Sequence, residues 1–223
     1  MPQPSLLFDL DGVLADSQAT ITRCIQQAFV ANGHPEPTDE AVLAIIGPPT
    51  RIGFGQLLGV EPDDPSVEPC VSAYRERYDI ALKETPTFPG VRDAIEELGR
   101  DLRLGVATSK PAHYAHQVLQ AIGLDDAFEV VVGPELTGVQ GKDEMVAAAL
   151  AQLGDGAPCL GMVGDRRPDM VAARNHGLYA IGVLWGFGSE QELTEAGAQV
   201  LVREPAELVA VVREAQAAVS RAA

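Results

Sequence analysis

The sequence predicts an α/β protein with a parallel sheet, helices on both of its faces and an inserted all-helical domain. Short apolar runs alternate with helical patterns through most of the 223 residues. Strands that alternate with helices of this length are typical of a parallel sheet. One long segment, 16–85, contains helical patterns without a convincing strand. Pairs of acidic residues also follow two of the apolar runs, at the sheet edge where such folds bind ligands.

The strands are predicted from short apolar runs bounded by turn residues, in chain order at 6–8, 104–108, 130–133, 159–164, 179–184 and, more weakly, 199–202. Helical periodicity separates them at about 92–99, 111–122, 142–153, 168–176, 189–196 and 205–219. These elements predict a three-layer, Rossmann-like core made of residues 1–15 and 86–223.

The inserted segment 16–85 is predicted to be a helical cap domain. Its helices each keep one face apolar, as shown by Ile21, Cys24, Ile25, Ala28 and Phe29 in one stretch and by Val67, Cys70, Val71, Tyr74 and Tyr78 in another. Residues 84–88 and 14–17 are the expected hinges, and we expect the cap to open and close over the site.

Composition excludes several classes of partner. The formal net charge of −16 argues against nucleic acid and anionic membranes. No run approaches the roughly 18 apolar residues that span a bilayer. The amino terminus has neither a basic region nor an apolar stretch, and the three cysteines are far apart. We therefore expect a cytoplasmic protein, monomeric or a small homo-oligomer.

The first motif is Asp9-Leu10-Asp11-Gly12, directly after the first apolar run. Side chains alternate along an extended chain, so Asp9 and Asp11 point to the same side, and Gly12 permits a sharp turn. Two crowded carboxylates require a cation or a shared proton. This is the chemistry of a metal-assisted nucleophile beside an acid/base partner. The alternative is a turn with solvated carboxylates, and the preceding strand favours the functional interpretation.

Two further motifs contain a hydroxyl group and a lysine. Thr108, Ser109 and Lys110 end the second strand, where a hydroxyl and backbone N–H groups that lead into a helix can bind an oxyanion. The alternative is a helix N-cap. Lys142 begins a helix, where a cation opposes the helix dipole. An ammonium turned inward toward carboxylate and phosphate explains this position, and a solvated lysine is the alternative.

The fourth motif, at 164–169, delivers Asp165 to a strand end, and Asp169 returns to the same side as a helix starts. Two more carboxylates at a strand end fit Mg²⁺, which takes few protein carboxylates and keeps waters. The alternative is N-capping by Asp169 and a solvated Asp165. The shared placement of all four motifs at strand ends is a stronger signal than any one motif.

Together these motifs resemble those of the haloacid dehalogenase superfamily of phosphohydrolases, over nearly the whole chain. The matching residues are 9–14, Thr108, Lys142 and 164–169. The helical insertion and the segments 88–91 and 185–189 are similar to the phosphoglycolate phosphatase-like branch, which has a small cap. The resemblance implies a phosphatase that acts on a small phosphorylated metabolite.

The resemblance also implies a role for each residue. Asp9 is the nucleophile that forms an aspartyl-phosphate, and Asp11 protonates the leaving oxygen and then activates water. Mg²⁺ is held by the Asp9 carboxylate, the Asp11 backbone carbonyl and Asp165, while Asp169 orients that shell. The metal would also supply the local positive charge needed to attract a phosphorylated substrate to a chain with a net charge of −16.

The remaining implied roles concern the substrate. Thr108 and the Ser109 amide bind phosphoryl oxygens, Lys142 stabilises their charge, and Lys110 belongs with the substrate-binding residues. Arg51 is the first candidate in the cap to meet a second anionic or polar group of the substrate. A solvated Arg51 on a helix is the alternative.

Phosphoglycolate is the leading substrate expected, with 5'-nucleotidase and pyrophosphatase activities as alternatives. A sugar phosphomutase shares every core residue. A dehalogenase does not need Asp11, and a phosphonatase needs a cap lysine, for which the cap offers only Lys83 at its far hinge. A non-catalytic binding module would be expected to lose the acidic residues, and all of them are present.

Overall fold

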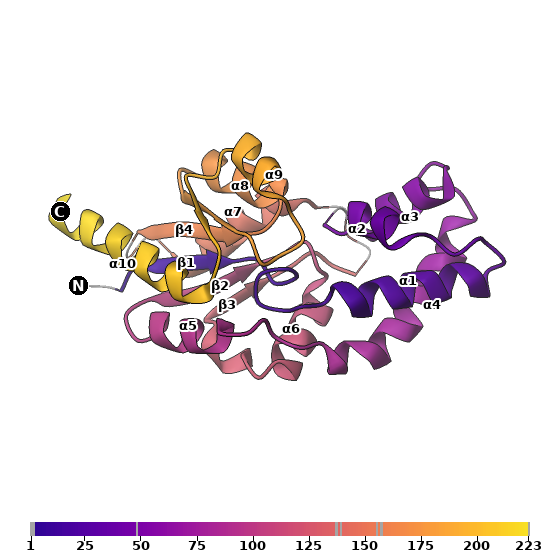
Figure 1. The fold of residues 1–223 in the computed structure, drawn as a ribbon, viewed down its shortest axis with the longest axis horizontal. Coiled ribbons are helices and arrows are strands. Elements are labelled where there is room, and N and C mark those ends of the chain that lie inside the picture. Colours follow the sequence, from indigo (N-terminus) through magenta and orange to yellow (C-terminus); the bar gives the residue numbers. More distant parts are fainter. Residues whose placement is uncertain are drawn as a thin grey trace.

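Six parallel strands form one sheet in the order β3-β2-β1-β4-β5-β6 (Figure 1). The computed structural model describes residues 3–47, 49–136, 138, 140–154, 156 and 158–222. The predicted α/β fold with a parallel, helix-covered sheet is confirmed. The strands are β1 (Ser5–Phe8), β2 (Arg103–Ala107), β3 (Val130–Val132), β4 (Cys159–Gly164), β5 (Tyr179–Val183) and β6 (Val200–Val202).

Helices cover both faces of the sheet because successive strand residues point to opposite sides. On the side of Leu6 and Phe8 the core contains α5 (Val91–Leu98), α6 (Ala112–Ala121) and α10 (Pro205–Ala222). On the side of Leu7 it contains α7 (Lys142–Leu153), α8 (Arg167–Asn175) and α9 (Glu190–Ala196). Two apolar cores thus fix the positions of the strand ends, where the polar motifs lie.

Within the described residues, the segment predicted to be a cap contains four α-helices. They are α1 (Gln18–Ala31), α2 (Asp39–Ile45), α3 (Thr50–Leu58) and α4 (Val67–Ala81), followed by the 3₁₀ turn η1 (Leu82–Glu84). Figure 1 shows these helices beyond one end of the sheet. Aromatic rings pack in series inside them, from Phe29 to Phe54 at 5.6 Å and from Phe54 to Tyr74 at 5.6 Å between centroids. The boundaries 16 and 85 stay a prediction.

Two short linkers join these helices to the sheet, and they are hydrogen-bonded to each other. The Asp16 amide donates to the Pro86 carbonyl at 2.9 Å, and the Thr87 hydroxyl donates to the Leu14 carbonyl at 2.8 Å. The two connections therefore lie side by side, as a two-stranded hinge requires.

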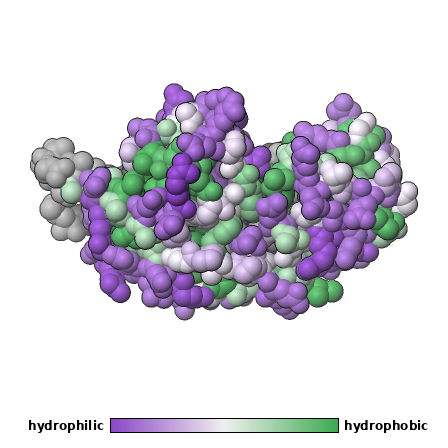
Figure 2. Space-filling view, viewed as in Figure 1, coloured by the Kyte–Doolittle hydropathy of each residue, from purple (hydrophilic) through white to green (hydrophobic). Residues whose placement is uncertain are grey.

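The strand order changes direction between β1 and β4, and ligands bind at such a switch point, outside the carboxyl ends of the strands. Asp9 follows β1 and Asp165 follows β4. In the space-filling view the surface dips between the helices α8–α9 and the helices α2–α3 (Figure 2). Within the described ranges, no helix is long and apolar enough to cross a bilayer.

Candidate active site

Three carboxylates meet at the carboxyl ends of β1 and β4. Asp9 and Asp165 directly follow the two paired strands, and Asp169 lies in the first turn of α8. One oxygen from each of the three lies within 4.8 Å of the others, and all three residues are buried. Burial of three like charges is unfavourable without a compensating cation.

Lys142 supplies one such cation. Its Nζ lies 2.7 Å from Asp9 Oδ1 and 2.9 Å from Asp169 Oδ1, and it donates to the Ala107 carbonyl at 3.2 Å. Burial opposes the charge, but the two carboxylates outweigh it and raise the pKa of Lys142. The lysine is therefore turned inward, although it stands at the first residue of α7.

Three carboxylates lie beside this single ammonium group, and burial together with the excess of negative charge raises the pKa values of two of them. Burial raises the pKa of Asp9 to about 6, opposed by Lys142 and reinforced by the charge of Asp169. Burial, followed by the charges of Asp169 and Asp9, raises the pKa of Asp165 well above its usual range. A second cation at this point would favour the ionised forms.

The Asp165 side chain identifies where such a cation fits. Its Oδ2 accepts a hydrogen bond from the Phe187 amide at 2.7 Å, while its Oδ1 is buried and has no hydrogen-bond partner among the described residues. A buried carboxylate oxygen without a donor is costly unless a ligand meets it. Asp9, Asp165 and Asp169 can therefore hold a metal ion.

Two glycines, Gly12 and Gly186, pack against the Asp165 side chain. A Cβ on Gly12 would lie 2.1 Å from Asp165 Oδ2, and a Cβ on Gly186 would lie 2.4 Å from Asp165 Cβ and 2.4 Å from the Gly12 carbonyl oxygen. Gly12 also has a φ of +84°, which favours glycine. Both glycines let the chain approach the carboxylates more closely than any other residue could.

Asp11 lies beside Asp9 but has its own partners. Its Oδ1 accepts from the Ser17 hydroxyl at 2.6 Å, and its Oδ2 lies 2.8 Å from Lys110 Nζ. Lys110 is buried, with Nζ 4.7 Å from the centre of the Tyr78 ring. Asp11 is thus oriented by two groups while it still faces the cavity described next.

A cavity separates these residues from the helices α1–α4 and has about 810 Å³ of space, part of it open to solvent. Asp9, Asp11, Thr108 and Ser109 line its sheet side. Thr108 is buried, and its hydroxyl accepts from the Lys110 amide at 3.2 Å. The helical side is largely apolar and aromatic, with one arginine, and comprises Ile21, Ile25, Ile45, Ile46, Gly47, Thr50, Tyr74, Arg75 and Tyr78. A second arginine, Arg166, lines the cavity from the sheet domain.

The structure brings together the predicted residues of all four motifs. Of the two predicted substrate-binding side chains that carry a charge, Lys110 lines the cavity and pairs with Asp11. Arg51 forms an ion pair with Glu68 and lines a smaller neighbouring pocket rather than the main cavity. The roles of all these residues stay predictions.

Sequence reasoning did not select Arg75 or Arg166, although both line the cavity. Arg75 donates to the Leu136 carbonyl at 2.8 Å, and no described carboxylate pairs with it. The sequence feature that could have identified Arg75 is its position next to Tyr74, which belongs to the apolar face of α4. Arg166 donates to the carbonyls of Leu43 and Ile46, which lie more than 100 residues away in the sequence, so no local pattern indicates these contacts.

The model of the haloacid dehalogenase-like hydrolase family matches residues 6–183 of the chain. The chain belongs to this family. The resemblance seen in the four motifs is therefore confirmed, and with it the prediction of an enzyme of the haloacid dehalogenase type.

Similar proteins of this haloacid dehalogenase-like family include named phosphatases. A 5'-nucleotidase from Pseudomonas aeruginosa is 38% identical over 85% of this chain and 86% of its own length. A phosphoglycolate phosphatase from Synechococcus elongatus is 28% identical over 94% of this chain and 97% of its own. The crystal structure of a predicted phosphatase from Clostridium acetobutylicum has a TM-score of 0.87 and 28% identity, covering 96% of this chain and all of that one.

Proposed function

We propose that the protein is a Mg²⁺-dependent phosphomonoester hydrolase that transfers the phosphoryl group to Asp9 and then to water. The observation that carries this proposal is the arrangement of Asp9, which contacts Lys142 and lies beside two buried carboxylates at the floor of a cavity. The phosphatases among its relatives support the same reaction class.

Asp9 is suited to attack phosphorus through one particular oxygen. The Leu10 amide at 2.7 Å and Lys142 Nζ at 2.7 Å both contact Oδ1. No described residue donates a hydrogen bond to Oδ2, so this oxygen is the one available for attack. Oxygen attack on phosphorus needs little beyond alignment and charge stabilisation, and the fixed carboxylate supplies alignment.

Asp11 is the proposed acid and base. An ester oxygen leaves readily only when it receives a proton, and the same carboxylate can then take a proton from the attacking water. Ser17 and Lys110 hold one oxygen each of Asp11, and the side chain lines the same cavity as Asp9. These contacts keep the carboxyl beside the reacting atoms during both steps.

The other residues would bind the phosphoryl oxygens. Thr108 and Ser109 line the sheet side of the cavity, and Lys142 contacts Asp9, which lines it too. Mg²⁺ held by Asp9, Asp165 and the Asp11 backbone carbonyl, with Asp169 orienting these ligands, would supply a Lewis acid that neutralises charge on the phosphate.

The cavity favours a substrate with a bulky leaving group. Its helical side presents four isoleucines and two tyrosines, which suit a flat, partly apolar group such as a nucleobase better than glycolate. A nucleoside 5'-monophosphate is therefore the first proposed substrate, and phosphoglycolate, the leading expectation from the sequence, is the second. The net charge of −16 disfavours a polyanionic partner.

Phosphate release from a panel of substrates tests this proposal. The panel contains nucleoside monophosphates, phosphoglycolate, pyrophosphate and sugar phosphates, each with Mg²⁺ and with EDTA. We expect release only with Mg²⁺ and fastest from a nucleoside monophosphate. No release from any member would overturn the proposal, and conversion of a sugar phosphate to its isomer without phosphate release would show a phosphomutase.

A further inference from the structure

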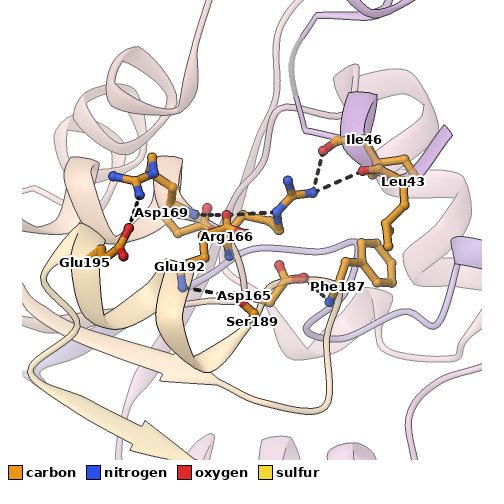
Figure 3. A network of polar contacts seen from close by, with 10 residues as sticks. Leu43, Ile46, Asp165, Arg166, Asp169, Phe187, Ser189, Glu192 and Glu195 are labelled. Atoms are coloured by element: carbon orange, nitrogen blue, oxygen red, sulfur yellow. Dashed lines mark hydrogen bonds and ion pairs between the residues drawn. The ribbon is translucent and has the colours of Figure 1, made fainter. Parts of the chain in front are cut away.

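The Arg166 side chain extends from the start of α8 to the helices of the predicted cap. Its Nη1 donates to the Ile46 carbonyl at 2.9 Å and to the Leu43 carbonyl at 3.4 Å (Figure 3). Both carbonyls lie at the carboxyl-terminal end of α2. The side chain is 20% exposed, so these bonds are partly shielded from water.

The end of α2 is a favourable partner for this guanidinium. The last carbonyls of a helix lack intrahelical donors and carry partial negative charge. The described last turn of α2 contains no basic residue. Arg166 therefore supplies a cation that α2 lacks, from a distant part of the chain.

The other side of Arg166 is anchored to the sheet domain. Its Nε lies 3.1 Å from Glu192 Oε1, and the Arg167 amide donates to the same oxygen at 2.8 Å. The Arg166 backbone amide donates to Asp169 Oδ2 at 3.0 Å, and Asp169 in turn contacts Lys142. Figure 3 shows this continuous path from α9 through Arg166 to α2.

This path ends at a wall of the cavity. Ile45, Ile46 and Gly47 line the cavity at the end of α2, opposite the carboxylates. A shift of this end of α2 therefore moves the surface that a leaving group would contact, while the phosphoryl site on the sheet side is unaffected.

We propose that Arg166 is a positioning residue that clamps the end of α2 over the leaving group, and so sets the affinity for substrates large enough to reach that wall. The kinetic part of this inference rests on the proposed hydrolase function, while the clamp itself does not. Without the guanidinium, α2 would separate more often from the sheet domain.

Hydrogen exchange of the whole chain tests the clamp without any substrate. Arg166→Met removes the donors, Arg166→Lys keeps the charge, and Arg167→Met is the matched control, because Arg167 pairs with exposed Glu195. We expect exchange in residues 39–47 to be about tenfold faster in Arg166→Met, as loss of charge-assisted hydrogen bonds implies. Arg166→Lys should be intermediate, and Arg167→Met should match the wild type.

Exchange in β1 and β4 reports whether Arg166→Met is globally unfolded. If it is, Glu192→Gln, which loosens the anchor of Arg166, should still accelerate exchange in 39–47 while exchange in β1 and β4 stays at the wild-type rate. Unchanged exchange in 39–47 in these variants, or equal acceleration in Arg167→Met, would overturn the clamp.

The kinetic test compares two leaving groups, a nucleoside monophosphate and methyl phosphate, each with Mg²⁺. Arg166→Met should raise KM about tenfold for the nucleotide, with kcat and the KM for methyl phosphate within about twofold. Equal effects on both substrates would contradict the positioning role. If wild-type protein hydrolyses neither, the proposed function fails, and the exchange result still decides the clamp.

Discussion

At the residue scale, the close approach of Gly12 to Asp165 gives a direct prediction. In Gly12→Ala the new Cβ would meet Asp165 Oδ2 at 2.1 Å, and alanine would be strained at a φ of +84°. The strain costs on the order of 1–2 kcal/mol, and the clash displaces a proposed metal ligand. We expect a folded protein that binds Mg²⁺ at least tenfold more weakly, measured by calorimetric titration.

Gly33→Ala is the matched control for this substitution. Gly33 has a φ of +76°, but a Cβ there meets nothing within 4 Å. Gly33→Ala should introduce similar backbone strain without the clash, and it should leave Mg²⁺ affinity unchanged. Wild-type affinity in Gly12→Ala would show that the metal does not bind at Asp165.

Most residues of the four motifs could be predicted because they lie at or just after the end of a strand, whereas Lys142 was selected because a cation at the start of a helix opposes the helix dipole. Asp9 and Asp165 follow apolar runs directly, so sheet geometry alone brings them together. Arg75 and Arg166 could not be predicted in this way. Their cavity positions depend on how the inserted helices pack against the sheet domain, which is a long-range contact that local patterns do not encode.

At the scale of elements, α4 brings Arg75 to the cavity, whereas α3 holds Arg51 against Glu68. Arg75 is therefore the better placed cation for a polar or anionic part of the leaving group. We expect Arg75→Gln to raise KM for the preferred substrate about tenfold and Arg51→Gln to change it less than about twofold. Steady-state kinetics of both variants measures this.

The two arginine variants control for each other, because each removes one positive charge from the same group of helices. A larger effect of Arg51→Gln would restore the residue that the sequence favoured. Equal effects would indicate a general influence of charge instead of contact with the substrate.

The core elements were predicted closely, and the inserted helices less fully. Strands alternating with helices in 92–219 have simple periodicity, which predicts a parallel sheet. In the insertion, the apolar faces of α1 and α4 were recognised, but Tyr74 and Tyr78 on that face also line the cavity. Periodicity shows that a face is covered, and it does not show whether a side chain or a ligand covers it.

At the scale of the whole molecule, metal binding should stabilise the fold in a pH-dependent manner. Burial raises the pKa of Asp9 to about 6, above its unfolded value of about 3.9. Protonated Asp9 therefore stabilises the metal-free fold below about pH 4, and this contribution is lost as pH rises through about 6. Mg²⁺ bound to the ionised carboxylates would compensate for this loss at higher pH.

We therefore expect Mg²⁺ to raise the melting temperature by several degrees near pH 7.5 and by little near pH 5. Calorimetric scans with Mg²⁺ or EDTA measure this. Asp126→Asn, at an exposed acidic residue, should leave the effect intact. A Mg²⁺ effect as large at pH 5 as at pH 7.5 would contradict binding at these carboxylates.

The whole molecule also explains why the site needs local cations. A net charge of −16 repels phosphorylated substrates at a distance, so attraction must come from groups in the cavity. Arg75 lines the cavity, Lys142 contacts Asp9 at its floor, and a metal ion held by the buried carboxylates would add positive charge there. Binding is therefore expected to depend on these few groups, and the single substitutions described above should have large effects.

The most direct test is to find the phosphoryl group on the protein. Wild-type protein and Asp9→Asn are mixed with Mg²⁺ and the best substrate, quenched with acid and analysed by peptide mass spectrometry. We expect a phosphorylated Asp9 in the wild type, and a folded Asp9→Asn with neither modification nor turnover. Appreciable turnover by Asp9→Asn, or a phosphoryl group on another residue, would contradict this expectation.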